Sequence, residues 1–201
     1  MVKMRTIRGF EIHDGRLSRT EQERWISALR EVISKAPLYA PVTRWGKPMS
    51  VRMTSAGAFG WYTDRRGYRY EPRHPDGQPW PPIPQVALEL WEALVPGGRH
   101  PECCLINHYR EGARMGLHQD RDEADFSWPV VSVSLGAPAL FRIGNVERGG
   151  PTESVWLNSG DVVVMGGEAR LRHHGIDRIK PDASDLLPEG GRFNVTMRVV
   201  T

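Results

Sequence analysis

The stretch VVSVSLGAPALFRIGNVERGGPTESVWLNSGDVVVM, residues 130–165, decides the fold. Its short runs are rich in β-branched and aromatic residues, and turns containing glycine, proline or asparagine separate them. The runs that we interpret as strands are residues 130–135, 140–143, 155–157 and 161–165. Several short strands at this spacing predict a sandwich or barrel, such as a double-stranded β-helix, also called a jelly roll.

Composition supports a β-rich protein. The 201 residues include 21 glycines and 16 prolines, which favours turn-rich structure over a helical bundle. The length predicts one domain over residues 1–201. The net charge of +3 and the pI of about 9.1 are compatible with a nucleic acid partner but do not require one.

Several negative signals favour a soluble cytoplasmic protein. No apolar run approaches the roughly 20 residues that span a bilayer, and the first residues do not lead into the apolar core of a signal peptide. The cysteines, Cys103 and Cys104, are adjacent, so we expect buried structural thiols rather than a disulfide.

Helical patterns flank the strand-rich region. The segment Ser18–Lys35 has apolar residues at helical spacing, a capping box of Ser18 and Glu21, and a stop at Pro37. A second helix is expected over Pro84–Leu94. The predicted fold class is therefore mostly β with flanking helices (α+β), in which residues 1–43 form an N-terminal support helix region.

The segment 44–82 mixes aromatic with basic residues, which suits stacking on nucleobases and contact with phosphates. An ordinary polar loop layer with anchoring aromatics explains the same composition, so both readings stay open. The residues concerned are Trp61, Tyr62, Tyr68, Tyr70 and Trp80, with Arg65, Arg66, Arg69, Arg73 and His74.

Two histidines and one carboxylate form a candidate metal site. On an extended chain His118 and Asp120 project from one face, and His174 supplies a third ligand if its strand returns beside them. This order matches the facial triad of non-haem iron enzymes. We favour His174 over His173 because Gly175 permits close approach of the backbone. We therefore expect His173 in a supporting or solvent position. The alternative for His118 and Asp120 is a surface histidine that is hydrogen-bonded near an acid.

The C-terminal run Arg192–Arg198 alternates between a polar and an apolar face. Two arginines on the polar face could hold a dicarboxylate, because the guanidinium fork binds carboxylates bidentately. A strand with its polar face toward solvent is the alternative. Asn107 and Tyr109 share one face of another expected strand, and their side chains could hydrogen-bond a bound acid.

Taken together, these residues resemble the AlkB family of iron(II)- and 2-oxoglutarate-dependent dioxygenases. The resemblance covers roughly residues 40–200. It rests on the runs 105–109, 117–123, 131–136, 160–168, 174–176 and 192–198, and on Gly60-Trp61-Tyr62 and Gly67-Tyr68-Arg69-Tyr70. It implies Fe(II) as the metal, with 2-oxoglutarate and O2 as cosubstrates. It also implies a jelly-roll catalytic core over residues 100–201 and a nucleotide-recognition lid over residues 44–82.

The resemblance also implies roles for single residues. The catalytic iron ligands would be His118, Asp120 and His174. The 2-oxoglutarate site would consist of Asn107, Tyr109, Arg192, Asn194 and Arg198, with Arg192 at the distal carboxylate. The substrate contacts would be Trp61, Tyr68, Asp122 and Arg148.

The activity that the resemblance implies is oxidative demethylation of N-alkylated bases such as 1-methyladenine and 3-methylcytosine. The substrate would be single- or double-stranded alkylated DNA, with RNA as a further candidate, and the enzyme would act as a monomer. The alternatives are a 2-oxoglutarate oxygenase for tRNA, protein or a small molecule, and a non-catalytic jelly-roll binding module. Two departures from the family pattern are Arg172-His173, where a more aromatic pair is usual, and a shorter N-terminal segment.

Overall fold

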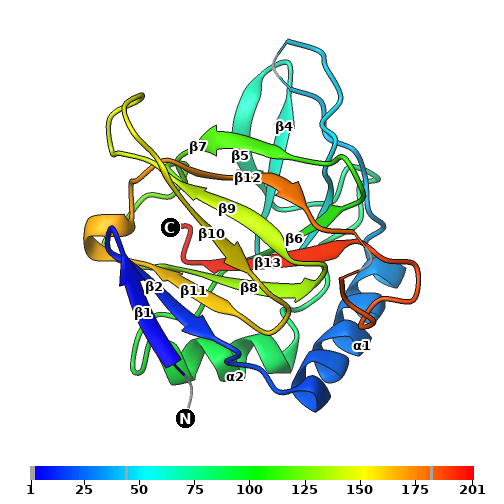
Figure 1. The fold of residues 1–201 in the computed structure, drawn as a ribbon. Coiled ribbons are helices and arrows are strands. Elements are labelled where there is room, and N and C mark those ends of the chain that lie inside the picture. The colour runs from blue at the N-terminus through cyan, green and yellow to red at the C-terminus, as the bar shows by residue number, and fades with distance from the viewer. Residues whose placement is uncertain (1–2, 44, 182) are drawn as a thin grey trace.

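The computed structural model describes residues 3–43, 45–181 and 183–201. Met1 and Arg44, which begin two of the predicted segments, lie outside the described residues, as do Val2 and Asp182. Two antiparallel sheets face each other, a two-stranded hairpin projects from one end, and two helices lie against the larger sheet (Figure 1). The predicted jelly-roll core is confirmed.

The larger sheet has seven strands in the order β1-β2-β11-β8-β13-β6-β3. This order places the C-terminal strand between β8 and β6, in the interior of the sheet. The strands are β1 (Lys3–Ile7), β2 (Phe10–Asp14), β3 (Arg52–Gly57), β6 (Cys103–Tyr109), β8 (Val130–Gly136), β11 (Val162–Met165) and β13 (Arg192–Arg198).

The smaller sheet has four strands in the order β10-β9-β12-β7. They are β7 (Met115–His118), β9 (Ala139–Ile143), β10 (Glu153–Leu157) and β12 (His174–Ile179). The projecting hairpin consists of β4 (Gly60–Asp64) and β5 (Gly67–Glu71), and a short 3₁₀ helix, η1 (Gly167–Ala169), precedes β12.

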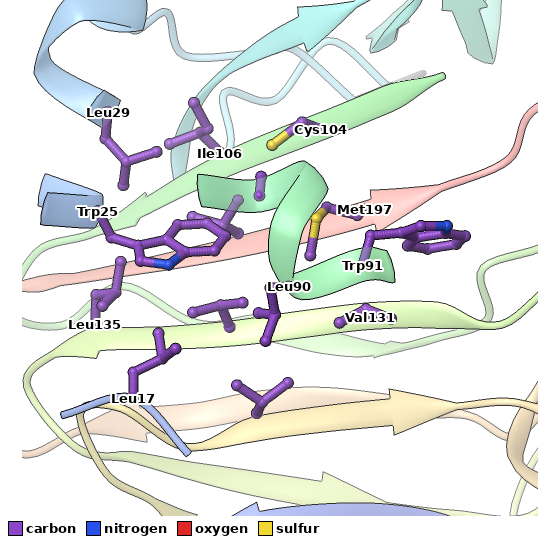
Figure 2. Close-up of a cluster of buried hydrophobic side chains, with 14 of the residues drawn as sticks. Leu17, Trp25, Leu29, Leu90, Trp91, Cys104, Ile106, Val131, Leu135 and Met197 are labelled. Carbon is purple, nitrogen blue, oxygen red and sulfur yellow. The ribbon is translucent and has the colours of Figure 1, made fainter. Parts of the chain in front are cut away.

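Both predicted helices are confirmed. Helix α1 (Arg19–Lys35) begins with the Ser18–Glu21 capping box, and α2 (Gln85–Leu94) follows Pro84. Their apolar faces pack on the outer face of the larger sheet, where Trp25 and Trp91 contribute the largest side chains (Figure 2). Burial of these aromatic side chains holds the helices against the outer face of the sheet. The inner face of the sheet remains for the site.

The alternation along β13 divides the two faces of the larger sheet. Val195 and Met197 are fully buried in the cluster beneath the helices. Arg192, Asn194, Thr196 and Arg198 point the other way and border a cavity between the sheets. The polar face of β13 is thus an internal wall rather than a solvent-facing surface.

Some boundaries differ from the sequence prediction. The strand expected over Met49–Thr54 is observed at Arg52–Gly57, because its partner β6 extends to Cys103, which pairs with Gly57. The β1–β2 hairpin was not predicted; it extends the larger sheet through β11. Cys103 and Cys104 are buried free thiols, as expected. Among the described residues, no helix is long and apolar enough to cross a membrane.

Candidate active site

A cavity of about 710 Å³ opens between the two sheets, below the β4–β5 hairpin. Its walls come from strands of both sheets, from the β4–β5 hairpin and from the chain that precedes them. All twelve residues predicted for iron, 2-oxoglutarate and substrate border this single cavity: Trp61, Tyr68, Asn107, Tyr109, His118, Asp120, Asp122, Arg148, His174, Arg192, Asn194 and Arg198. The structure therefore brings together residues that are up to 137 positions apart in the sequence (Trp61 to Arg198).

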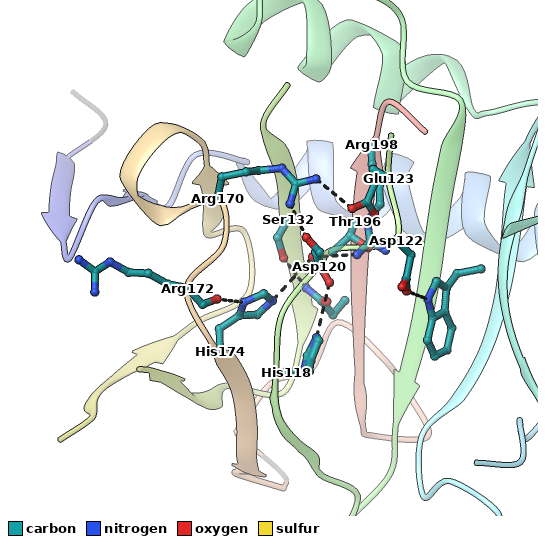
Figure 3. Close-up of polar contacts among 12 residues, drawn as sticks. His118, Asp120, Asp122, Glu123, Ser132, Arg170, Arg172, His174, Thr196 and Arg198 are labelled. Atoms are coloured by element: carbon teal, nitrogen blue, oxygen red, sulfur yellow. Dashed lines mark hydrogen bonds and ion pairs between the residues drawn. The ribbon is translucent and has the colours of Figure 1, made fainter. Parts of the chain in front are cut away.

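Three of these residues converge on one point. His118 ends β7 and His174 begins β12, and the two are paired in register in the smaller sheet. The His118 Nε2 atom lies 3.6 Å from Asp120 Oδ1, and His174 Nε2 lies 3.7 Å from Asp120 Oδ2 (Figure 3). One ligand atom from each residue can be chosen so that all three lie within 4.8 Å of one another. This donor set is the two-histidine, one-carboxylate triad that suits iron(II).

Hydrogen bonds to backbone carbonyl oxygens orient both imidazoles. His118 Nδ1 lies 2.9 Å from the Gly116 carbonyl oxygen, and His174 Nδ1 lies 3.1 Å from that of Arg172. A carbonyl can only accept, so each Nδ1 carries the proton and each Nε2 presents a lone pair to the cavity. Burial also lowers the pKa of His174 to about 4, which keeps this imidazole neutral and able to bind a metal.

Asp120 is held as a carboxylate. Burial by itself would raise its pKa, but nearby positive charge, led by Arg198, brings the pKa below its usual value. Arg198 Nη2 donates to Asp120 Oδ2 over 3.1 Å. An anionic, preoriented oxygen between two imidazole Nε2 atoms matches what a divalent metal requires.

Arg192 is a buried cation that lacks an anionic partner. It is fully buried on β13, and its guanidinium donates to Ser134 Oγ at 2.7 Å and to the Ala137 carbonyl at 3.4 Å. Its Nε has no acceptor, and no carboxylate of the described residues forms an ion pair with it. Burial lowers the pKa of Arg192 to about 10. A buried, hydrogen-bonded but unneutralised guanidinium fits a carboxylate ligand.

Neighbouring polar groups complete this wall. The Asn107 Oδ1 atom is buried without a hydrogen-bond partner among the described residues. Tyr109 is 2% exposed, and its hydroxyl stays protonated because burial raises its pKa. Asn194 Nδ2 donates to Ser132 Oγ over 2.8 Å. The unused acceptor and the neutral hydroxyl provide further hydrogen bonds for a bound acid.

The β4–β5 hairpin places an aromatic platform at the cavity mouth. The rings of Trp61 and Tyr68 stack with centroids 5.3 Å apart and an interplanar angle of 22°. Trp61 Nε1 donates to Asp122 Oδ2 over 2.9 Å, so the carboxylate fixes the plane of the indole. Arg148 borders the mouth from the exposed loop that follows β9.

A buried charge network behind Asp120 was not predicted. Glu123 accepts from Arg170 Nη2 at 2.9 Å and from the Tyr70 hydroxyl of the hairpin. Arg170 also donates to the Asp120 backbone carbonyl, and Arg198 donates to the Tyr70 hydroxyl. The network ties the hairpin to the metal ligand. The sequence predicts this network only weakly, because glutamate and arginine usually lie on the surface unless they are paired.

His173 and Arg172 lie beside the site. His173 is half-buried at the edge of the cavity, and its Nδ1 is 3.0 Å from the Asn145 carbonyl oxygen. Arg172 forms an ion pair with Glu168 at 2.5 Å. The family usually has a more aromatic pair at these two positions. Here His173 bonds to the adjacent loop, and Arg172 bonds to the 3₁₀ helix.

Gly175 gives a direct test of how the two histidines are brought together. A Cβ there would lie 2.6 Å from the Met115 carbonyl oxygen and 2.8 Å from that of Gly116. Gly175→Ala should therefore push β12 from β7 and cost roughly 1–3 kcal/mol, part of it as lost iron affinity. We expect the apparent affinity for anaerobic iron(II), measured from the thermal shift that iron(II) produces, to fall at least about tenfold.

Gly116→Ala is the matched control for this experiment. A Cβ at Gly116 meets nothing within 4 Å, so the iron-induced shift should stay close to that of the parent chain. Equal losses in both variants would contradict the proposed role of Gly175 in strand approach.

Comparisons with known proteins agree with this geometry. The family model described as the 2OG-Fe(II) oxygenase superfamily matches residues 9–198. The chain is 51% identical to the alpha-ketoglutarate-dependent dioxygenase AlkB homolog of Caulobacter vibrioides, over 94% of this chain and 87% of that protein.

Two further matches are more distant. The chain is 42% identical to the DNA N(6)-methyladenine demethylase ALKBH1D of Arabidopsis thaliana over 49% of this chain and 24% of that protein. The solved structure of OsALKBH1 superposes with a TM-score of 0.82 at 30% identity, and covers 97% of this chain and all of the other. The chain therefore belongs to the AlkB family of the 2OG-Fe(II) oxygenase superfamily, and is an iron(II)- and 2-oxoglutarate-dependent dioxygenase.

Proposed function

We propose that this dioxygenase removes methyl groups from N-alkylated bases of DNA, such as 1-methyladenine and 3-methylcytosine, with RNA as a further substrate. The observation that carries the proposal is the stacked pair Trp61–Tyr68 with Asp122, because it stands at the mouth of the cavity that contains His118, Asp120 and His174. The DNA demethylase named among the relatives supports the same substrate class.

His118, Asp120 and His174 would hold iron(II) on one side and leave the other side open toward the cavity. Bound iron(II), with 2-oxoglutarate and dioxygen, supplies the oxidation that hydroxylates the N-methyl group, and the product releases formaldehyde while succinate and carbon dioxide leave. Arg198 holds Asp120 in its anionic form and orientation. Arg170 fixes the backbone at the same residue.

The 2-oxoglutarate site would lie along β13 and β6. Arg192 would neutralise the distal carboxylate, and Asn107, Tyr109 and Asn194 would hydrogen-bond the rest of the molecule. Arg198 is placed for the end near the iron, because it contacts Asp120 directly. The assignment uses the buried cation and the unsatisfied amide oxygen described above.

A damaged base would reach this site only after leaving its stack, because the triad lies in a cavity between the two sheets. Trp61 would stack on the extruded base, Tyr68 and Arg148 would contact the nucleic acid, and residues 44–82 would cover the cavity as a lid. A single chain provides every one of these residues, so we propose that the enzyme acts as a monomer. We also propose that it acts in the cytoplasm.

Asp122 should distinguish charged from neutral lesions. Both 1-methyladenine and 3-methylcytosine are cationic, whereas 3-methylthymine is neutral. Asp122→Asn keeps an acceptor for the Trp61 indole and removes only the charge, so kcat/KM should fall about fivefold or more on cationic lesions and change little on 3-methylthymine.

Asp122→Ala also removes the hydrogen bond to Trp61. We expect this variant to lose more activity than Asp122→Asn on every lesion, and still most on the cationic ones. Equal losses on cationic and neutral lesions in both variants would show that charge is not involved.

The substrate class is tested by formaldehyde release from a panel of methylated oligonucleotides, single- and double-stranded DNA and RNA, with tRNA and methylated peptides alongside. The proposal expects formaldehyde from methylated DNA in the presence of iron(II) and 2-oxoglutarate. Formaldehyde release from tRNA or peptide, and not from methylated DNA, would favour the alternative oxygenase. If none of these substrates yields formaldehyde while a small molecule supports succinate formation, the enzyme acts on small molecules.

A further inference from the structure

The turn between β1 and β2 has a backbone conformation that its first residue does not favour. Ile7 pairs with Phe10, so Arg8 and Gly9 form the two-residue loop of a tight hairpin. Their φ angles are +47° and +81°, and Arg8 is the only residue other than glycine with a positive φ among those that the structure describes. Such turns favour asparagine, aspartate or glycine at the first position. A strained backbone of this kind persists where surrounding contacts hold it.

The Arg8 side chain makes those contacts with the loop between β9 and β10, residues 144–152. Its Nη1 atom donates to Asn145 Oδ1 at 3.0 Å and to the Pro151 carbonyl oxygen at 3.1 Å. Its Nε atom donates at 2.6 Å to Glu153, the first residue of β10. Both the turn and this loop lie on the left of Figure 1. One planar guanidinium with three acceptors fixes the loop relative to the edge of the larger sheet.

Asn145 closes the part of the loop that contains Arg148. Asn145 Nδ2 donates to the Gly149 carbonyl oxygen over 2.9 Å, and Gly149 has φ +102°. A Cβ at Gly150 would lie 2.5 Å from the same Nδ2 atom, so the next residue must be a glycine for this closure. Arg148 is exposed, borders the cavity and forms no ion pair with the described residues. The backbone of the loop therefore determines where its guanidinium can reach.

On its inner side, the loop is bonded to residues next to the iron ligands. The backbone N and the Nδ1 atom of His173 donate to the Asn145 carbonyl oxygen, at 2.9 and 3.0 Å. Gln119, between two of the ligands in the sequence, donates from Nε2 to the Val146 carbonyl oxygen at 3.0 Å. The loop is thus held from two sides, and these bonds set the position of Arg148 relative to the triad.

We propose that Arg8 and Asn145 are positioning residues for the nucleic acid: they hold the β9–β10 loop so that Arg148 meets the phosphate backbone of the strand whose damaged base enters the cavity. This inference rests on the proposed demethylase function, in which Arg148 contacts the nucleic acid. Phosphate contacts set the register of a strand on a protein. A cation that is already in place loses less conformational freedom on binding, which strengthens binding. Arg8 acts through Arg148, because its own donors are occupied by the loop.

Arg8→Asn tests this without disturbing the hairpin, because asparagine is favoured at this position of the turn. The KM for a 3-methylcytosine oligonucleotide should rise about fivefold or more, while kcat stays within about twofold of the parent value. Asn145→Ala should change both constants in the same way. Arg5→Ala is the matched control, because Arg5 lies in the same hairpin and bonds only to Asp14 there, at 2.8 and 3.1 Å. Its KM should equal that of the parent chain.

A double-mutant cycle shows whether Arg8 acts through Arg148. Arg148→Ala alone should raise KM at least as much as Arg8→Asn does. Adding Arg8→Asn to Arg148→Ala should raise KM no further, because the residue that Arg8 positions is already gone. A second rise of the same size would mean that Arg8 contacts the nucleic acid itself and would overturn the proposal. A parent-like KM in both Arg8→Asn and Asn145→Ala would also overturn it.

Limited digestion with trypsin gives a measurement that needs no substrate. Trypsin cleaves after arginine, and the bond between Arg148 and Gly149 lies in the held turn. Cleavage there should be at least about fivefold faster in Arg8→Asn and Asn145→Ala than in the parent chain or Arg5→Ala, because a loosened loop is cut more readily. Unchanged cleavage would show that these residues do not hold the loop. Failure of every methylated oligonucleotide to yield formaldehyde would instead defeat the demethylase function, and the cleavage rates distinguish the two failures.

Discussion

Replacing Asp120 by alanine should abolish turnover, with a loss of roughly a thousandfold or more, because a metal centre contributes several kcal/mol to the transition state. Asp120 supplies the anionic member of the triad and lies between the Nε2 atoms of His118 and His174. The variant should also lose the thermal stabilisation that anaerobic iron(II) gives to the parent chain. The activity assay is formaldehyde release from a 3-methylcytosine oligonucleotide.

Asp125→Ala provides the control, since this exposed carboxylate follows five residues later and caps a local turn at Ser127. Iron response and turnover should both persist in that variant. An Asp120→Ala protein that keeps its iron response would mean that other groups hold the metal. The same result for His118→Ala would exclude the triad as the iron site.

Replacing Arg192 by methionine should raise the KM for 2-oxoglutarate at least about a hundredfold, since truncating one partner of a buried charge pair costs 2–5 kcal/mol or more. The side chain is fully buried and forms no ion pair with any carboxylate of the described chain. Without cosubstrate, the variant should be as stable as the parent chain or more so, because it no longer buries an uncompensated charge.

Arg192→Met should thus weaken 2-oxoglutarate binding without lowering the stability of the chain. A variant that is merely misfolded would lose both. Titration with 2-oxoglutarate in the presence of iron(II) should raise the Tm of the parent chain and leave that of Arg192→Met almost unchanged. Arg178→Met, which removes an exposed arginine that lies over Trp156, should behave like the parent. A KM within threefold of the parent value would mean that Arg192 does not bind the cosubstrate.

Periodicity predicted much of the fold. The two helices were correctly placed because apolar spacing, a capping box and prolines define them locally. The alternation of β13 was equally clear, but the sequence left open which face was internal. That question is settled by the position of β13 between β8 and β6, a long-range pairing that no local pattern encodes.

The candidate site was likewise predicted only in part from local sequence pattern. His118 and Asp120 were candidates from spacing, yet their approach to His174 depends on the register of β7 with β12 and on the close backbone contact at Gly175. The family resemblance provided this information where spacing could not.

Other features had no usable signal in the sequence. The strand Lys3–Ile7 is mostly exposed at the edge of the sheet, so its pattern lacks the buried alternation that marks a strand. Glu123 and Arg170 have the composition of a solvated surface, and only the fold shows that they neutralise each other behind Asp120.

Measuring both products of one reaction tests the assignment of this site most directly. The reconstituted enzyme would be given a 3-methylcytosine oligonucleotide, iron(II), 2-oxoglutarate and oxygen, and succinate and formaldehyde would be measured in the same reaction. We predict equal amounts of both, and neither product when iron or 2-oxoglutarate is omitted. Succinate without formaldehyde from any methylated oligonucleotide, or formaldehyde that forms without 2-oxoglutarate, would contradict the assignment of this site to oxidative demethylation.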